Sequence, residues 1–96
     1  MEFLVQIEVR WPADGDPAER RRLGEAEAVR TRELAAAGHI RRLWRVPGRR
    51  ANWGLWEAAD ATELDRALMS LALYPWMEVE VHPLAQHERD PGAPRR

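Results

Sequence analysis

The feature that most constrains the fold is an alternation of apolar and polar residues at the start of the chain. The apolar set is Phe3, Val5, Ile7, Val9 and Trp11, and the polar set is Glu2, Gln6, Glu8 and Arg10. A period of two residues is typical of a β-strand with one buried face. Leu4 interrupts the polar set, which indicates that the second face is not wholly exposed to water. The chain therefore opens with a strand that needs a cover on at least one side.

A turn and a capped helix are predicted to follow this strand. Asp16 can cap the helix, Pro17 suits its first position and Glu19 completes a capping box. We expect the helix to run from Pro17 to about Ala37, with Gly38 as its C-terminal stop. At 100° per residue, one face carries Leu23, Ala26, Arg30, Leu34 and Ala37.

The rest of the chain predicts two strands, a second helix and a final strand. Residues 39–46 and 50–57 are expected to form an antiparallel hairpin, because only Pro47-Gly48-Arg49 connects them. Asp60 starts a helix with an apolar stripe formed by Leu64, Ala67, Leu68 and Leu71. The fourth strand alternates Met77, Val79 and Val81 with Glu78, Glu80 and His82.

The predicted order is βαββαβ, which is the ferredoxin-like pattern of the α+β class. It places two helices on one face of a four-stranded antiparallel sheet. Because the chain has 96 residues, we expect one domain over residues 1–87, followed by a polar C-terminal tail over residues 88–96. The other sheet face would expose Leu4, Leu43 and several tryptophans, so we predict that a further subunit covers it in a homo-oligomer.

Composition excludes several function classes. The chain has no cysteine and its 15 basic residues are all arginine, which excludes disulfides, thiolate chemistry, lysine Schiff bases and a P-loop lysine. A formal net charge of -1 argues against nucleic-acid binding. No apolar run approaches about 18 residues, and no basic-then-apolar leader opens the chain. We therefore expect a small, soluble, cytoplasmic protein that binds neither nucleic acid nor membrane.

Five arginines within ten residues form a candidate anion site. They are Arg41, Arg42, Arg45, Arg49 and Arg50. In a strand, Arg41 and Arg45 share a face with Leu43, whereas Arg42 shares the other face with Ile40, Trp44 and Val46. A guanidinium group can bind a carboxylate through two parallel hydrogen bonds. The alternative is a solvated hairpin face or a network of ion pairs at an interface.

Two further side chains are candidate catalytic or binding groups. Glu27 falls at the edge of the packing face of the first helix, where loss of hydration raises a carboxyl pKa and suits a general base. Arg30 could instead pair with it and lower that pKa. Asn52 is the only asparagine and stands in a strand, where this residue type is unfavourable. Both could also be purely structural.

The histidines and tryptophans do not by themselves identify a functional site. His39, His82 and His87 show no metal-ligand spacing, so no metal site is expected. The five tryptophans are mostly expected in the core or at a subunit interface, although one or two of them, Trp44 in particular, are candidates for the wall of a ligand pocket.

Two segments give the chain a likeness to a known family. Residues 41–53 read RRLWRVPGRRANW and residues 68–81 read LMSLALYPWMEVEV. Together they resemble the muconolactone Δ-isomerase family, and the likeness extends without gaps from the first strand to His87.

The resemblance implies a ferredoxin-like subunit in a ring-like homo-oligomer, a decamer in the family, that uses no cofactor. The family's reaction moves a ring double bond in an unsaturated lactone with a carboxymethyl arm, in the β-ketoadipate route of aromatic catabolism. Glu27 stands where the family has its glutamate, which implies the catalytic base. The small anionic lactone is then expected to contact the arginine segment and its neighbours: Arg41, Arg45, Arg49, Arg50, Asn52 and Trp44.

Several departures from the family pattern lie near the expected pocket. Ala28 replaces a lysine, Arg30 an aliphatic residue, and Arg49-Arg50 a His-Tyr pair. A Cys-Arg-His stretch is replaced by Ala85-Gln86-His87. These changes leave open a related lactone dehalogenase, a small cyclase or isomerase of secondary metabolism, or a non-catalytic oligomeric protein that binds an anionic ligand.

Overall fold

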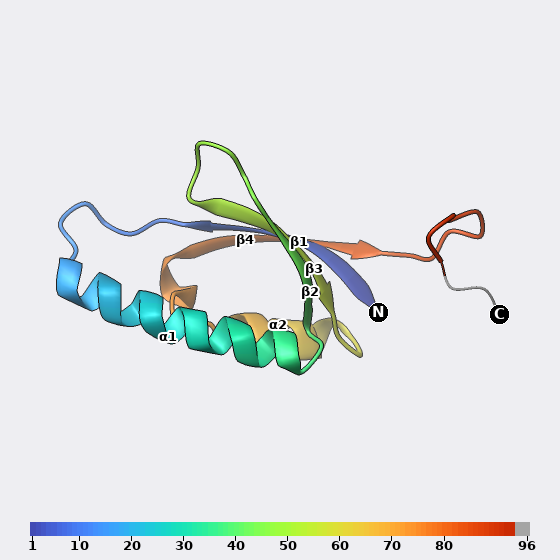
Figure 1. Ribbon diagram of the computed structural model, residues 1–96, viewed down its shortest axis with the longest axis horizontal. Coiled ribbons are helices and arrows are strands. Elements are labelled where there is room, and N and C mark those ends of the chain that lie inside the picture. Colours follow the sequence, from blue (N-terminus) through green and yellow to red (C-terminus); the bar gives the residue numbers. More distant parts are fainter. Residues whose placement is uncertain (94–96) are drawn as a thin grey trace.

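The structure, a computed structural model, describes residues 1–93 and forms one four-stranded sheet with two α-helices (Figure 1). The elements are β1 (Glu2–Val9), α1 (Pro17–Ala36), β2 (Ile40–Arg45), β3 (Ala51–Glu57), α2 (Ala61–Met69) and β4 (Met77–Leu84). A short 3-10 turn, Tyr74–Trp76, leads into β4. The βαββαβ order confirms the predicted ferredoxin-like fold.

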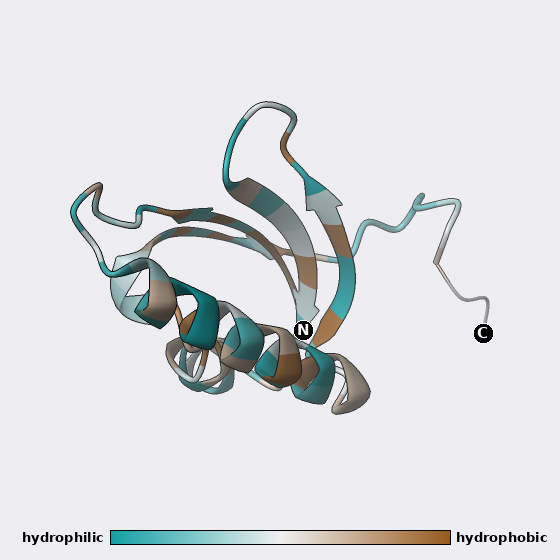
Figure 2. Ribbon diagram, turned by 60° about the vertical axis from the view of Figure 1, so that its left-hand side comes forward, coloured by the Kyte–Doolittle hydropathy of each residue, from teal (hydrophilic) through white to brown (hydrophobic). Residues whose placement is uncertain are grey.

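The sheet is antiparallel throughout, with the strand order β2-β3-β1-β4. Val5 of β1 lies opposite Gly54 of β3 on one side and Val81 of β4 on the other. Figures 1 and 2 show both helices on the same side of this sheet. The apolar set of β1 faces them, since Phe3, Val5 and Ile7 are buried.

Local sequence accounts for the helix boundaries. The Asp16 carboxylate accepts a hydrogen bond from the Ala18 N–H at 2.9 Å, and Pro17 opens α1. The helix ends at Ala36, one residue before the expected end, and Gly38 leaves it with a φ of 86°. In α2 the Asp60 carboxylate accepts a hydrogen bond from the Glu63 N–H at 2.9 Å.

The two helices contribute unequally to the core. Helix α2 buries Leu64, Ala67 and Leu68, as its apolar stripe predicts. Helix α1 buries only Leu34, and the expected packing positions Ala26 and Ala37 are exposed. Because few bulky side chains of α1 pack against the sheet, space remains between this helix and the strands. That space is the pocket described below.

Strand β2 departs from the predicted pattern. Its register against β3 shifts between Ile40, opposite Trp56, and Arg42, opposite Leu55. This bulge at Arg41 adds one residue and reverses the alternation that follows. Leu43 still shares a face with Arg45, and Arg42 with Trp44, as expected. The expected position of Ile40 is wrong, because Ile40 lies on the helix side together with Leu43 and Arg45.

The face of the sheet away from the helices is partly apolar. It carries Leu4, Trp53 and Leu55, which are half-buried, and Trp44, which is 44% exposed. Trp53 lies 6.0 Å from His82 across β1, measured between ring centroids. We call this surface, formed by Leu4, Trp44, Trp53, Leu55 and Leu84, the open face. Its cover by another subunit stays a prediction.

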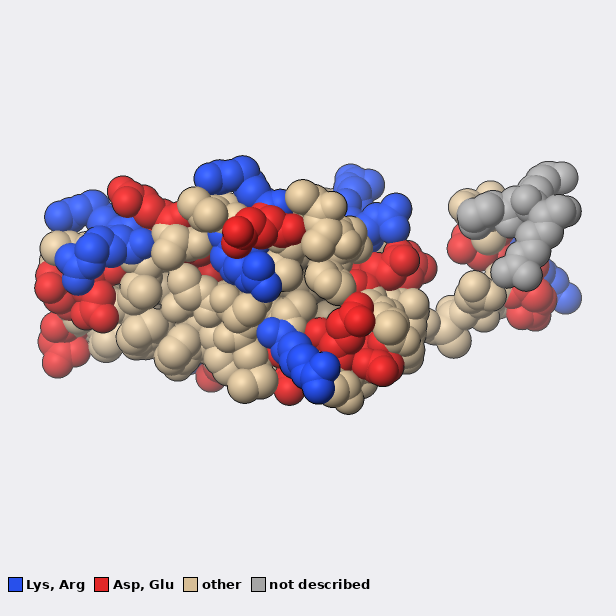
Figure 3. Space-filling model, turned by 90° about the horizontal axis from the view of Figure 1, so that it is seen from below, with Lys and Arg blue, Asp and Glu red and all other residues tan. Residues whose placement is uncertain are grey.

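Charges of both signs are interspersed around the side of the molecule seen in Figure 3. Among residues 1–93, neither helix combines the length and the apolar character needed to cross a bilayer. Residues 85–93 are exposed and lie outside helices and strands. The last three residues of the predicted tail, 94–96, lie outside the described residues, and the division at residue 87 stays a prediction.

Candidate active site

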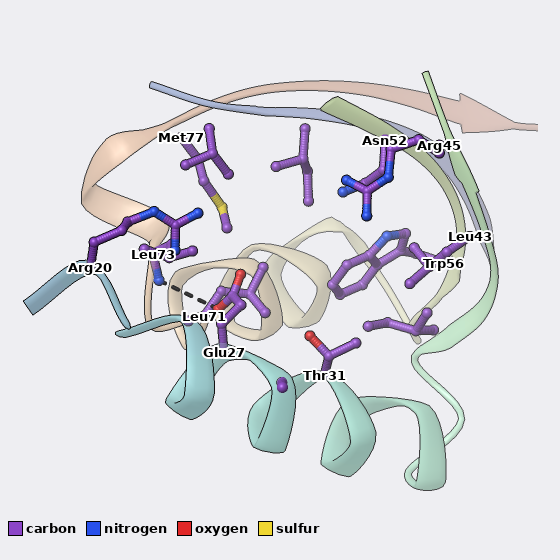
Figure 4. Close-up of a pocket in the computed structure, with 15 residues that line it drawn as sticks. Arg20, Glu27, Thr31, Leu43, Arg45, Asn52, Trp56, Leu71, Leu73 and Met77 are labelled. Atoms are coloured by element: carbon purple, nitrogen blue, oxygen red, sulfur yellow. Dashed lines mark hydrogen bonds between the residues drawn. The ribbon is translucent and has the colours of Figure 1, made fainter. Parts of the chain in front are cut away.

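A pocket of about 320 Å³ lies between α1 and the helix-side face of the sheet (Figure 4). Helix α1 forms one wall, and side chains from β1, β2 and β3 form the other. Leu71 and Leu73, which follow α2, close one end together with Met77. Most of the lining is apolar, so the few polar groups in it determine what the pocket can bind.

Glu27 projects from α1 into this pocket and is half-buried. Its Oε1 atom accepts a hydrogen bond of 3.4 Å from the Leu73 N–H. Burial raises the pKa of Glu27 above the ordinary glutamate value. The N–H groups of Leu73 and Ala72 and the charge of Arg20 lower this pKa, but they do not cancel the effect of burial.

Arg30 does not pair with Glu27, which removes one alternative. Its Nε atom donates to Ser70 Oγ at 2.9 Å, and its Nη1 atom lies 3.5 Å from Glu33 Oε1. Arg30 therefore connects α1 to the end of α2. The cation that acts on Glu27 is Arg20, two helical turns earlier on the same face of α1.

Arg45 and Asn52 lie opposite each other on β2 and β3, and both line the pocket. The bulge at Arg41 is what turns Arg45 toward the helices. Asn52 Oδ1 is buried without a hydrogen-bond partner within residues 1–93. Arg45 is exposed, and within the same residues no ion pair holds its guanidinium group.

The structure does not bring the other predicted contact residues to this pocket. Arg41 lies at the bulge and pairs with Glu57 at 2.7 Å, and Arg49 pairs with Glu8 near the open face. Trp44 lies on the open face beneath the Arg42 guanidinium, whose Cζ atom is 5.0 Å from the ring centroid. Arg50 is exposed and is not among the lining residues.

Sequence reasoning missed two residues of the pocket, Arg20 and Thr31, and did not single out Trp56 among the five tryptophans. Arg20, Thr31 and Trp56 all line the pocket. Arg20 lies 5.9 Å above the Trp11 ring, and its Nε atom is buried without a partner within the described residues. The spacing of Arg20, Glu27 and Thr31 along α1 was the available signal, because positions 7 and 11 residues apart share a helical face.

The site therefore combines one carboxylate of raised pKa with two guanidinium groups and an amide. A carboxylate whose pKa is raised can accept a proton from a weakly acidic carbon and give it back. Cationic and amide N–H groups can stabilise the negative charge that develops on an oxygen. Within residues 1–93 no three His, Cys, Asp or Glu side chains are grouped so as to hold a metal ion.

Comparison with known proteins gives a consistent result. The family profile described as muconolactone delta-isomerase matches residues 1–90. Muconolactone Delta-isomerase of Pseudomonas putida is 34% identical over 87 residues, which is 91% of each chain. Muconolactone Delta-isomerase 2 of Acinetobacter lwoffii is 36% identical with the same coverage, and the Rhodococcus opacus protein is 33% identical over 92% of this chain and 95% of its own. A crystal structure of muconolactone isomerase superposes with a TM-score of 0.90, 33% identity and full coverage of both chains.

Proposed function

Because this chain belongs to the muconolactone delta-isomerase family and is an isomerase, we propose that it converts muconolactone to 3-oxoadipate enol-lactone. The reaction moves one ring double bond in an unsaturated lactone with a carboxymethyl arm. The observation that carries this proposal is Glu27, a half-buried carboxylate of raised pKa that lines a pocket otherwise rich in apolar groups and arginine.

In the proposed reaction Glu27 is the only base. Its carboxylate removes the proton from the ring carbon that bears the arm, and the electron pair of the broken C–H bond moves into the ring. The lactone carbonyl oxygen takes up the negative charge of the resulting dienolate. Glu27 then returns the proton to the carbon two positions away on the same face, which restores the carbonyl and leaves the double bond shifted.

Arg45 and Asn52 supply the charge complementarity. Arg45 is proposed to bind the carboxylate of the arm, since a guanidinium group forms strong charge-assisted hydrogen bonds with a carboxylate. Asn52 is proposed to donate to the carbonyl oxygen, where fixed donors lower the barrier as charge develops. Arg41, Arg49, Arg50 and Trp44 have no part in this proposal, because they do not line the pocket.

The test is proton exchange in deuterium oxide, followed by NMR with muconolactone as the substrate. We expect the enol-lactone to appear, with deuterium incorporated when the Glu27 proton exchanges with solvent before its return. Release of chloride from a chlorinated lactone in place of isomerisation would indicate a dehalogenase. Binding without turnover or exchange would indicate a ligand-binding protein and would contradict the proposal.

The assembly is part of the same proposal. The open face carries Trp44 and Trp53, and Trp44 is largely exposed in a single chain. A second subunit would remove this apolar surface from water, and we propose the ring-like decamer that the family resemblance implies. The cytoplasmic location expected from the sequence stays a prediction, which cell fractionation can test.

A further inference from the structure

The indole N–H of Trp56 is a polar group of the pocket that has no role in the proposed reaction. The Trp56 side chain is only 1% exposed and lines the pocket. Its indole Nε1 atom is buried and has no hydrogen-bond partner within residues 1–93. Buried N–H groups are nearly always paired, because an unpaired one has lost its contact with water and gained nothing. An unpaired indole N–H at a pocket wall therefore points to a ligand acceptor.

Gly54 leaves the space that the N–H edge of Trp56 occupies. A Cβ atom at Gly54 would lie 2.6 Å from Trp56 Nε1 and 3.0 Å from Leu43 Cδ2. Both distances are shorter than normal contacts, so a side chain at residue 54 would displace the indole nitrogen. Glycine at this position therefore allows the nitrogen to lie where it does.

The same end of the pocket gathers two other nitrogen-bearing side chains. Asn52, Gly54 and Trp56 stand at every second position of β3 and so lie on one face of the sheet. Arg45 lies opposite Asn52 on β2. Figure 4 shows the nitrogen edge of Trp56 turned toward Arg45 and Asn52, while Glu27 lies across the pocket on α1. No carboxylate other than Glu27 lines the pocket within the described residues. This end is therefore suited to oxygen atoms that carry negative charge.

We propose that the Trp56 indole N–H donates a hydrogen bond to the lactone carbonyl oxygen of the substrate, beside Asn52. This inference rests on the proposed isomerase function and deepens it by assigning a second donor. When Glu27 removes the ring proton, the charge moves to this oxygen and the hydrogen bond strengthens. When Glu27 returns the proton, the oxygen becomes a neutral carbonyl again, so Trp56 itself neither gains nor loses a proton.

Access to the indole nitrogen requires a small rearrangement. Leu43 packs over Gly54 beside the nitrogen and is 45% exposed, and Arg45 is exposed as well. Both residues are exposed on β2, the edge strand of the sheet, so neither is itself part of the buried core. A ligand that displaces the Leu43 side chain would reach the nitrogen.

The kinetic test is Trp56→Phe, which removes the donor and keeps an aromatic ring in the core. We expect kcat to fall about 10²-fold, as for the loss of one oxyanion donor, with a much smaller change in KM. Trp53→Phe is the matched control, because Trp53 lies on the same strand and faces away from the pocket. Thermal unfolding and light scattering establish that both variants fold and assemble like the parent.

Gly54→Ala gives a second variant that keeps the indole. Its Cβ atom must displace the indole nitrogen, so kcat should fall although every donor is still present. Native kcat in both folded variants, Trp56→Phe and Gly54→Ala, would overturn the assignment of Trp56.

NMR of the unmodified protein tests the same contact without turnover. The probe is the saturated lactone with a carboxymethyl arm, which lacks the double bond and cannot isomerise. Its binding should move the indole N–H resonance of Trp56 downfield and slow its exchange with solvent, while that of Trp53 stays unchanged. Turnover of muconolactone without any response of Trp56 would contradict this inference and leave the isomerase function intact. A response of Trp56 without turnover would contradict the isomerase function and support the contact.

Discussion

The Oε1 atom of Glu27 accepts a hydrogen bond of 3.4 Å from the N–H of Leu73, a residue 46 positions further along the chain. This contact fixes the carboxylate of α1 against the segment that follows α2. It also stabilises the ionised form, whereas burial favours the protonated form and prevails, so the pKa of Glu27 is raised. The base is thus held in one orientation, and its pKa lies above that of an ordinary glutamate.

Glu27→Gln should abolish turnover. Glutamine keeps the size of the side chain and can still accept the Leu73 hydrogen bond, but it cannot take up a proton. Solvent deuterium should no longer enter the lactone, and kcat should fall by at least 10²-fold, the lower part of the range for general base catalysis. Binding of the saturated lactone should persist in calorimetry. Isomerisation at close to the native rate would place the base elsewhere.

The same substitution should stabilise the protein at neutral pH. Since the folded pKa of Glu27 is raised above the unfolded one, its contribution to stability is fully present below the unfolded pKa and is lost as the pH rises through the folded pKa. Glutamine cannot ionise and avoids this loss. The Tm of Glu27→Gln should therefore exceed that of the parent at pH 7, and the difference should shrink near pH 4. An equal or growing difference toward acid pH would contradict the raised pKa.

The sequence was most informative where a periodic pattern and a cap agreed. The apolar stripe of α2 and the apolar–polar alternation of β1 predict both the elements and their buried faces. They do so because burial alone decides which residue type stands at these positions. Glu27 could be identified because it falls at the edge of the packing face of α1 and stands where the resembled family has its glutamate. The position of the pocket could not be predicted, because it depends on how few bulky side chains of α1 pack against the sheet.

The arginine segment shows why the rest of the site escaped prediction. The sequence of residues 40–45 predicts a continuous strand, and no residue in it predicts the bulge at Arg41. One extra residue exchanges the faces of all that follow, so Arg45 reaches the pocket whereas Arg41 does not. Trp56 was missed for a different reason: a buried tryptophan suggests only core until its unpaired nitrogen and the space at Gly54 are seen together.

Arg20→Gln should shift the acid limb of the pH–activity profile upward. The Arg20 charge lowers the pKa of Glu27, and its removal lets that pKa rise further. Because only the ionised carboxylate can act as a base, kcat/KM at pH 5–6 should drop more than at pH 8. Arg22→Gln is the control, since Arg22 is exposed on the same helix and does not line the pocket. If the pH profiles of kcat/KM for Arg20→Gln and the parent superimpose, Arg20 does not act on Glu27.

Arg45→Gln should raise KM about 10- to 100-fold, the equivalent of a lost charge-assisted hydrogen bond of about 1.5–3 kcal/mol. The fold should be unaffected, because Arg45 is exposed and lies at the end of β2. Arg41→Gln is the matched control from the same strand: it breaks only a surface ion pair with Glu57, so stability should change by less than about 1 kcal/mol and KM should not change. Steady-state kinetics would contradict this assignment if Arg41 proved the more sensitive of the two.

Trp44→Glu should separate the subunits of the proposed oligomer. Trp44 lies on the open face, 44% exposed in the single chain, so a carboxylate there is tolerated by the monomer. At an interface the same carboxylate would be buried without a partner. A buried, unpaired carboxylate is far higher in free energy than a hydrated one. Light scattering at micromolar concentration should therefore report a large assembly for the parent and smaller species for the variant. Val29→Glu is the control, because Val29 is 49% exposed on α1, on the side of the sheet opposite to the open face. A monomeric parent, or an unchanged mass for Trp44→Glu, would show that the open face is not covered by a second copy of the chain.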